Sequence, residues 1–550
     1  MGQTGYSQPI PKAGIGGSPR FAARTPIHLP KKRHPNIRTL SARRDNVMVS
    51  PPKASTGVQE RVLVYVVWFA LAVMLLSRIS LNIVDPDIFH EMALIRQGLV
   101  LGHIPTVDYF SYGPTHRYVL QHEWGSGAIA YLVATRLGAP GILLLKYLLA
   151  ALLAWLCVAT AGSRNPNPLP ALCWLAPIAI YFTGAAFSPI RGHLYSMIFT
   201  ACLLYFLESD RRGNRRWIAI WLLLSVLWFN LHGGAFVGVL LLGAHAFEQF
   251  LRGSRWLHLV LVATGTLAAA VVNPYGVRYY PYLWHALRMS RPAIGEWRPI
   301  WESFEYLNAG VFVLSLLLVL YLAVRIGLRA MPGIVILLTT AAATALHIRM
   351  FPFYGIAWAC YVPGFLLASP FAPRLRGWFD RPSLLLQAAW MIVAMFFLDV
   401  AIACHPWILE VPGEGKVGEV VYPTGAVQYL ADQQFHGNVM VPFEYGAYVS
   451  WKLYPAVRVA VDSRYEVAYP TQWVEEVFRV YRADAGWQQT LAGHPTDVIL
   501  VRLSDPLERV IGSVPWRRVY VDRSYSIYTR PGLTLPPVDF HDRVFPGRFP

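Results

Sequence analysis

The run RVLVYVVWFALAVMLLS (residues 61–77) is followed after four residues by NIVDPDIFHEMALIRQG (residues 82–98). The first stretch is apolar over most of the length that a membrane-spanning helix needs. The second concentrates Asp85, Asp87, His90 and Glu91 within seven residues. Polar groups gathered at a bilayer surface are costly to place and are often functional. The two stretches together predict a first membrane span that leads directly into a chemically active loop.

The composition of the whole chain is that of a membrane protein. Its 550 residues are 55% hydrophobic and only 14% charged, whereas soluble domains carry roughly 25% charged residues. The net charge of +17 is concentrated in residues 1–61, which hold eleven Lys and Arg against Asp45 and Glu60. We predict that this Pro- and Gly-rich segment is a disordered cytoplasmic tail. It has no aromatic platform interleaved with the charge, so we expect no nucleic-acid partner.

Eleven apolar segments are predicted to span the membrane as helices. They lie near residues 62–81, 141–161, 170–187, 194–208, 216–230, 235–252, 257–272, 309–327, 332–347, 352–370 and 386–404. Residues 124–138 form either a further short span or an interfacial helix, so a total of twelve or thirteen crossings stays open.

Positively charged loops set the predicted direction of these helices, because Lys and Arg favour the cytoplasmic side. The basic loops are residues 210–216, 252–256, 325–329 and 373–381. The outward-facing connections are then residues 82–140, 188–193, 230–234, 273–308 and 347–354. An odd number of spans also places the residues after Cys404 outside.

From residue 405 the composition becomes that of a soluble domain. The predicted strands are residues 437–451, 457–465, 496–503 and 525–530, and the predicted helices are residues 424–435 and 471–483. We therefore predict a mainly α polytopic membrane protein with a membrane domain over residues 62–404. Residues 405–535 are expected to form a small extracytoplasmic α/β domain, and residues 536–550 a Pro-rich tail.

Polar residues gather at the helix ends that are predicted to face outward. The candidates for substrate binding are His90, Glu91, His122, Glu123, Arg191, His193, Asn230, His232, Glu296, His347 and Arg349. Their convergence on one face predicts a shared cavity at the boundary between membrane and water, with residues 82–140 folded over it.

Asp85 and Asp87 are the candidates for a catalytic base. An aspartate before IFHEMALIRQG is also a good helix N-cap, so one of the pair is expected to cap and the other to do chemistry. Asp87 and His90 are three residues apart and share a helical face. This spacing suits an acid–base pair, and it also leaves open a divalent metal site formed by Asp85, Asp87 and His90.

Arg191 and Arg349 lie at outward-facing helix ends, against the inward bias of positive charge. Each is therefore expected to meet an anion. A lipid headgroup phosphate is one alternative, and a substrate with a phosphodiester or pyrophosphate group is the other.

A motif in the first outer loop joins many of these residues. It consists of Asp85-Pro86-Asp87, His90, Gly98, Ile104-Pro105, Asp108, Phe110-Ser111 and His122-Glu123-Trp124, followed by WFNLHGG (228–234), NPYG (273–276), EW (296–297) and GAY…VDSRYE (446–466). Over residues 62–530 this pattern resembles a group of mostly uncharacterised bacterial proteins of the GT-C superfamily of integral membrane glycosyltransferases. The chain is also distantly similar to oligosaccharyltransferase catalytic subunits and protein mannosyltransferases.

The resemblance implies an inverting transfer of a sugar from a polyprenyl-phosphate donor to an extracytoplasmic glycan, lipid or protein. It implies a multi-pass protein of the bacterial plasma membrane, with membrane lipids around it and a role in the cell envelope. Asp85-Pro86-Asp87 also resembles the acidic DP motif in the first loop of the oligosaccharyltransferase catalytic subunit. This resemblance implies that Asp85 first, and Asp87 second, activates the acceptor or binds a divalent metal. The C-terminal region has no WWD-type motif, which favours a glycan or lipid acceptor over asparagine.

Two other classes of function remain open at this point. A transporter or lipid flippase should show internal repeats, with ionisable or helix-breaking residues near the middle of the bilayer in corresponding halves. The sequence shows no such repeat, and its polar residues gather at one face. A non-catalytic envelope assembly protein would use the outer domain to bind partners. The acidic pair Asp85 and Asp87, together with the outward arginines, favours an enzyme over both alternatives.

Overall fold

The computed structural model describes residues 55–289, 295–302, 306–414 and 421–550. Most of the predicted basic tail therefore lies outside the described residues, and its last residues begin the first helix. Residues 54–550 form one compact unit.

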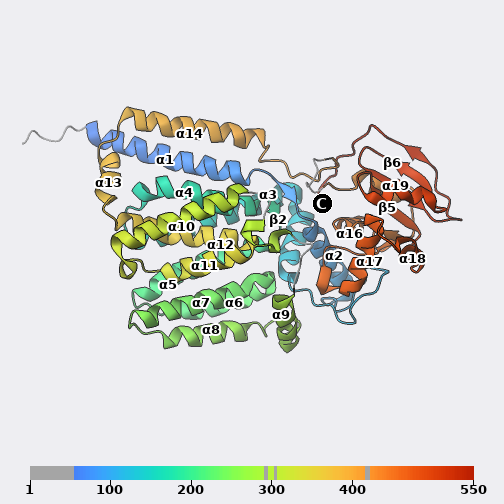
Figure 1. Cartoon of the computed structure of the whole chain (residues 1–550), viewed down its shortest axis with the longest axis horizontal. Coiled ribbons are helices and arrows are strands. Elements are labelled where there is room, and N and C mark those ends of the chain that lie inside the picture. Colours follow the sequence, from blue (N-terminus) through green and yellow to red (C-terminus); the bar gives the residue numbers. More distant parts are fainter. Residues whose placement is uncertain (1–54, 290–294, 303–305, 415–420) are drawn as a thin grey trace, which may run out of the picture. The chain divides into compact units, whose positions relative to one another are not determined.

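Each of the eleven predicted spans coincides with a helix, which confirms a mainly α membrane protein (Figure 1). These helices are α1 (Ser55–Ile79), α3 (Trp124–Gly162), α4 (Leu169–Gly184), α5 (His193–Arg211), α6 (Trp217–Leu231), α7 (Phe236–Leu251), α8 (Leu257–Ala269), α10 (Tyr306–Ile326), α11 (Ile334–Leu346), α12 (Phe351–Leu367) and α14 (Leu384–Ala403). Seven of the described helices are long and apolar enough to cross a membrane, and α6, α8 and α11 are shorter apolar helices.

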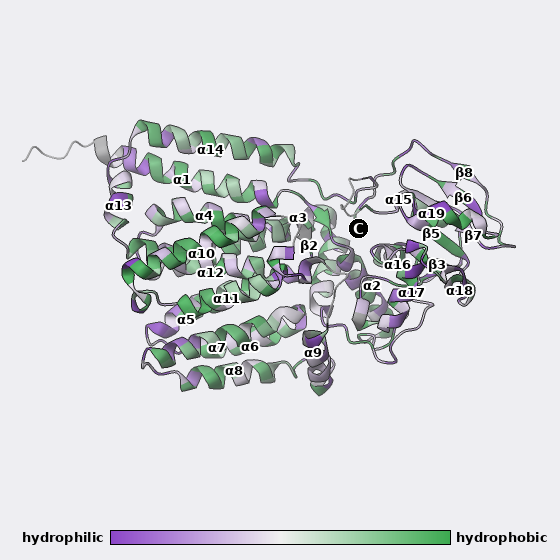
Figure 2. Cartoon of the chain, viewed as in Figure 1, coloured by the Kyte–Doolittle hydropathy of each residue, from purple (hydrophilic) through white to green (hydrophobic). Residues whose placement is uncertain are grey.

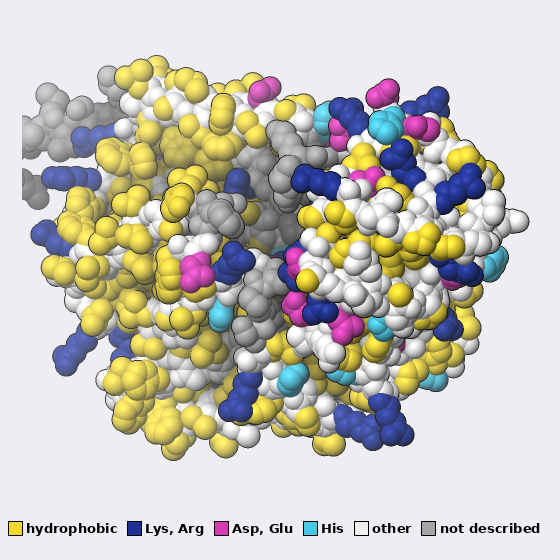
Figure 3. Space-filling view, turned by 45° about the vertical axis from the view of Figure 1, so that its right-hand side comes forward, with side chains coloured by type: hydrophobic (Ala, Val, Ile, Leu, Met, Phe, Trp, Pro, Cys, Tyr) yellow, Lys and Arg dark blue, Asp and Glu magenta, His cyan; other side chains and the backbone are white. Residues whose placement is uncertain are grey.

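The surface of the helical bundle is suited to lipid. Figure 2 shows that its helices are predominantly hydrophobic along their length, and Figure 3 shows hydrophobic side chains over its exposed face. On α10, for example, Leu314, Leu320 and Val324 are all exposed. In water such a surface would be costly, because each exposed Å² of apolar area forgoes about 25 cal/mol of burial energy.

The segment 124–138 is helical and is separated from the span that follows it. α3 breaks at Gly138, where φ is 63° and ψ is −155°, two residues before Pro140. Glycine tolerates this positive φ, and proline cannot donate the hydrogen bond that would continue the helix. The first part of α3 packs on α2 (Pro86–Leu101), so closely that a Cβ on Gly127 would lie 2.9 Å from the Glu91 backbone oxygen.

The C-terminal region is a six-stranded mixed sheet with helices, as expected for a small α/β fold. The strand order is β4-β3-β5-β7-β6-β8. The strands are β3 (Gly437–Met440), β4 (Val457–Val459), β5 (Val498–Arg502), β6 (Arg517–Val521), β7 (Tyr525–Thr529) and β8 (Val538–Asp539), and the helices are α15 (Thr424–Asp432), α16 (Gly446–Leu453), α17 (Thr471–Arg482), α18 (Trp487–Ala492) and α19 (Pro506–Val510). β3 is parallel to β4 and β5, and β7 is antiparallel to β5 and β6.

Two details of the predicted C-terminal region differ from the structure. The strand predicted over residues 437–451 ends at Met440, and residues 446–453 form α16 instead. Residues 445–451 are buried on all sides, so their apolar pattern has no period that separates helix from strand. Residues 536–550, predicted as a tail, supply β8, and the Gly547 amide donates to the Val411 carbonyl oxygen at 3.1 Å.

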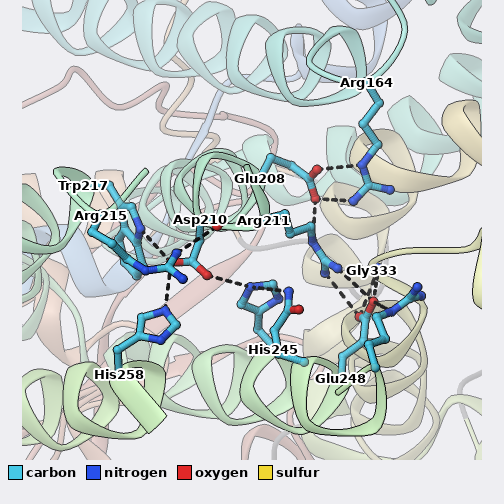
Figure 4. A network of polar contacts seen from close by, with 12 residues as sticks. Arg164, Glu208, Asp210, Arg211, Arg215, Trp217, His245, Glu248, His258 and Gly333 are labelled. Carbon is cyan, nitrogen blue, oxygen red and sulfur yellow. Dashed lines mark hydrogen bonds and ion pairs between the residues drawn. The ribbon is translucent and has the colours of Figure 1, made fainter. Parts of the chain in front are cut away.

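A buried network of charges joins the ends of α5, α6, α7, α8 and α11 that lie away from the C-terminal region (Figure 4). The Glu248 carboxylate accepts from Arg211 at 2.9 Å and from the Gly333 amide at 2.8 Å. The Asp210 carboxylate accepts from Trp217 Nε1 at 3.1 Å and contacts His258. Because these carboxylates are buried and paired, the network fixes the helix ends relative to one another.

Candidate active site

The site begins where α2 begins, at the end of the bundle that faces the C-terminal region. β1 (Ile83–Val84) and β2 (Pro189–Ile190) form a short parallel pair in which Val84 lies beside Ile190. The next residues on the two strands are Asp85 and Arg191, and the pairing brings them together. Arg191 Nη1 lies 3.7 Å from Asp85 Oδ2.

The structure assigns the helix cap to Asp85. Its Oδ1 accepts from the Asp87 amide at 3.0 Å, and its backbone is extended as a cap requires. One oxygen of Asp85 is thus occupied by the cap while the other faces Arg191. Asp87 lies in the first turn of the helix, and burial followed by the charge of Asp85 raises its pKa well above the ordinary value.

Glu296 lies between Arg191 and Arg349. Arg191 Nη2 donates to Glu296 Oε2 at 2.6 Å, and Arg349 Nη1 lies 3.8 Å from Glu296 Oε1. The Arg349 guanidinium also stacks over the Trp297 ring, with 4.2 Å from Cζ to the ring centroid. Each arginine therefore meets an anion, as its position at a helix end predicts, and that anion is a carboxylate of the chain itself.

His193 contacts Arg191 directly, and His347 contacts Trp297, the residue on which Arg349 stacks. Arg191 Nε donates to His193 Nδ1 at 3.1 Å, so the His193 proton lies on Nε2 and is donated to the Ala186 carbonyl oxygen. His347 Nδ1 lies 2.7 Å from the Trp297 carbonyl oxygen, to which it donates. Through these contacts both histidines hold neighbouring groups of the chain.

A second cluster lies beside the first and contains Glu91, His122, Glu123 and His232. The Gly234 amide donates to His232 Nδ1 at 2.9 Å, so His232 Nε2 carries the proton and donates to Glu123 Oε1 at 3.2 Å. His122 Nε2 lies 3.4 Å from the same oxygen. Burial acts to raise the pKa of Glu123, yet the two histidines hold it well below its usual range.

Glu91 is the member of this cluster whose pKa is raised. Its Oε2 accepts from Ser126 Oγ at 2.7 Å. Burial, and then the adjacent Glu123 carboxylate, raise the pKa of Glu91 well above its ordinary value. A Cβ on Gly192 would lie 3.0 Å from Ser126 Oγ and 3.5 Å from Glu123 Cδ. A side chain at residue 192 would crowd Ser126, so glycine suits this close approach between the start of α5 and the second cluster.

Two predicted site residues lie elsewhere. His90 Nε2 contacts Gln121 Oε1 at 3.2 Å on the side of α2 that faces the C-terminal region. Asn230 accepts from Trp124 Nε1 at 3.0 Å and donates to the Val272 carbonyl oxygen at 2.7 Å, so it joins α3 and α6 to the end of α8. Asn230 is therefore bound to structural partners.

The divalent metal site does not fit this arrangement. Among the described residues, no group of three or more His, Cys, Asp or Glu side chains is placed to hold a metal ion. His90 faces away toward Gln121, and the positive charge nearest to Asp85 is the Arg191 guanidinium. No step of the chemistry below is assigned to a metal.

A small, largely apolar cavity of about 30 Å³ lies between α2, α3 and α5 and reaches Arg191. Ile142, Leu145 and Leu149 line its α3 side. Lys146 lies among them, and its Nζ donates to Asn82 Oδ1 at 2.6 Å. No ion pair to a carboxylate is found for this ammonium within the described ranges. The sequence reasoning missed Lys146, although an ionisable residue inside an apolar span is itself a signal.

We expect the folded protein to lose stability as the pH falls from about 6.5 to about 4. Burial lowers the pKa of both His90 and His232 to about 4, whereas the unfolded chain titrates near 6.5. Between these values only the unfolded state takes up protons, which costs about 3 kcal/mol of stability per histidine. Thermal unfolding of the purified protein at several pH values measures this loss.

The exposed His436 supplies the control for this pH dependence. His436→Gln should leave the fall in melting temperature between pH 6.5 and 4 unchanged. A melting temperature that stays constant over this range would contradict the burial of neutral His90 and His232.

Comparison with known proteins gives structural likeness only. No family model matches the chain, and no curated protein matches it. Two solved structures of ArnT from Cupriavidus metallidurans align with it, each at 14% identity. The form bound to undecaprenyl phosphate has a TM-score of 0.45, and the alignment covers 100% of its length and 88% of this chain. The apo form has a TM-score of 0.47, and the alignment covers 98% of its length and 86% of this chain. Likeness at this level says nothing about activity, which must be inferred from the site.

Proposed function

We propose that the protein is a membrane glycosyltransferase of the GT-C type that moves a sugar from a polyprenyl-phosphate donor to an extracytoplasmic acceptor. The observation that carries the proposal is the pocket between α2, α3 and α5. It joins apolar side chains of the bundle to the cations Lys146 and Arg191, and Arg191 lies beside the Asp85 carboxylate. A lipid chain with a phosphate head matches this combination of surfaces.

The donor phosphate would meet two positive groups in this pocket. Arg191 is held by Glu296, and Lys146 is held by Asn82 and the Leu81 carbonyl oxygen. Lys146 lacks a carboxylate partner among its described contacts, so a phosphate would supply the anion that a buried ammonium favours. The isoprenoid chain would then lie along Ile142, Leu145 and Leu149.

Asp87 is the proposed base. It takes the proton of the acceptor hydroxyl as that oxygen forms a bond to the anomeric carbon. The bond between this carbon and the phosphate oxygen breaks on the opposite face, so the configuration inverts. Negative charge then builds on the departing polyprenyl phosphate, where Arg191 and Lys146 stabilise it. Asp85 caps α2 and keeps Arg191 in place.

The orientation follows from the same proposal. Loop 82–123, Arg191, Glu296 and Arg349 lie at the end of the bundle next to the C-terminal region. The basic loops at the other helix ends favour the cytoplasm for that side. We therefore propose that the active site and the α/β region, with boundaries near residues 405 and 535, face the cell exterior.

The experiment that tests this function has two parts. Membranes containing the protein are assayed with a panel of polyprenyl-phosphate sugars, and the purified protein in nanodiscs is assayed for binding of radiolabelled polyprenyl phosphate. We expect transfer from one donor class. Lys146→Met should weaken phosphate binding about tenfold or more, since a charge-assisted hydrogen bond contributes about 1.5–3 kcal/mol.

Lys452→Met is the matched control, because Lys452 does not line the pocket and donates to the carbonyl oxygens of Arg548 and Pro550. It should bind the lipid phosphate like the wild type. No transfer from any donor, together with binding that Lys146→Met leaves unchanged, would contradict the proposal and favour a transport or assembly role.

A further inference from the structure

The VDSRYE segment of the C-terminal region contains a buried arginine that reaches the first loop. The side chains of Arg464, Asp108 and Asp462 are 3%, 2% and 0% exposed. Arg464 Nη1 lies 2.5 Å from Asp108 Oδ1, and its Nε and Nη2 donate to Asp462 at 2.8 and 2.7 Å. A buried guanidinium is costly unless carboxylates pair with it. Removing any one of these three groups would therefore leave an uncompensated buried charge.

The backbone around Asp108 is bound to the same region. The Tyr112 amide donates to the Val459 carbonyl oxygen at 3.0 Å, and the Val459 amide donates to the Phe110 carbonyl oxygen at 2.9 Å. The His116 amide donates to the Ala468 carbonyl oxygen at 2.8 Å. Residues 110–116 therefore extend the C-terminal sheet region as an added edge, and Arg464 neutralises the Asp108 carboxylate beneath it.

The C-terminal region also contacts α2, the helix whose first turn contains the proposed base Asp87. Asp87 and His90 lie one turn apart on α2, and burial followed by the positive charge of Arg464 lowers the pKa of His90. α2 also packs on α16, where the Phe89 and Tyr448 ring centroids are 5.1 Å apart. The C-terminal region thus packs on α2, the helix that begins at the two aspartates.

We propose that Arg464 is a positioning residue for the active site: by pairing with Asp108 and Asp462 it fixes loop 104–121 and the start of α2 in the geometry that the transfer requires. The inference rests on the proposed glycosyl transfer for its catalytic meaning. It gives the C-terminal region a defined role, because the proposed active site is incomplete without a residue from that region.

The test uses the full-length protein in nanodiscs with Arg464→Met and Arg464→Lys. Amide hydrogen exchange of residues 104–121 reports on positioning without any substrate. We expect this segment to exchange faster in Arg464→Met, while β5 (Val498–Arg502) exchanges as in the wild type and shows that the region remains folded. Arg464→Lys keeps one charge contact and should restore part of the protection.

Kinetics supply the second measurement. We expect kcat of Arg464→Met to fall about 100-fold, because a misplacement of about 1 Å has an effect of that size. The KM for the lipid donor should change less than about threefold, since Arg464 does not line the donor pocket. Arg164→Met removes a different buried ion pair, that of Arg164 with Glu208, at the opposite end of the bundle. It should leave both the exchange of residues 104–121 and kcat near the wild-type values.

The outcomes separate the two proposals. Unchanged exchange of residues 104–121, or a wild-type kcat, in Arg464→Met would overturn the positioning role. Faster exchange in Arg464→Met, combined with a wild type that transfers from no donor, would support the contact and refute the proposed activity. A higher donor KM with an unchanged kcat would place Arg464 in substrate binding and would also overturn the proposal.

Discussion

Asp87→Asn is expected to lower the rate of sugar transfer by about 100- to 10,000-fold, which is the usual contribution of a general base. The asparagine is nearly isosteric but cannot accept the proton of the acceptor hydroxyl at a useful rate. Asp85→Asn should have a smaller effect, because asparagine also caps helices well and only the charge opposite Arg191 is lost. Initial rates with saturating lipid-linked donor measure both variants.

Asp484→Asn is the control for this comparison, since Asp484 is exposed and paired only locally with Arg482. It should transfer like the wild type. A large loss in Asp85→Asn with a small one in Asp87→Asn would exchange the two roles. Full activity in both would remove the aspartates from the chemistry.

The pH profile of the wild type gives an independent test of the base. Burial, and then Asp85, raise the pKa of Asp87 above its ordinary value of 3.8. Because the base acts only when ionised, the rate should be full above this raised pKa and should fall as the pH drops through it. An acid limb in kcat at or below pH 3.8 would contradict Asp87 as the base.

The sequence predicts the helices of the bundle well, because a membrane span is a local property. A run such as residues 309–327 is apolar over most of its length, and no tertiary contact is needed to recognise it as a helix. The cap at Asp85 is also local, since it depends on a proline and an apolar run that follow directly. What the sequence leaves open is which aspartate caps, because Asp85 and Asp87 precede the same run.

The contacts that build the site are long-range, and no periodicity shows them. The pairing of Val84 with Ile190 brings Asp85 to Arg191 across more than a hundred residues. The sequence predicts that Arg191 binds an anion such as a phosphate, but in the structure Arg191 binds the Glu296 carboxylate of the chain itself. Arg464 belongs to a motif that the sequence shows, yet its partner Asp108 is visible only in the folded chain.

The contacts of Arg191 predict the second large effect on the rate of sugar transfer. Arg191→Met should lower kcat about 100- to 1,000-fold, which is the loss seen when one preorganised group that stabilises developing negative charge is removed. It would also leave the Asp85 and Glu296 carboxylates without the cation between them. Arg191→Lys should retain part of the rate, since an ammonium keeps the charge but cannot bind both carboxylates in the same fork.

Glu296→Gln is the variant that separates charge stabilisation from architecture. It removes a carboxylate from Arg191 and Arg349 but leaves the pairing of Arg191 with Asp85 intact. We expect a smaller loss than in Arg191→Met. Measured together, kcat and donor binding decide the role of Arg191. A loss in kcat with little change in binding means that the guanidinium acts on the leaving phosphate in the transition state. Weaker binding at an unchanged kcat would instead restrict Arg191 to holding the bound donor.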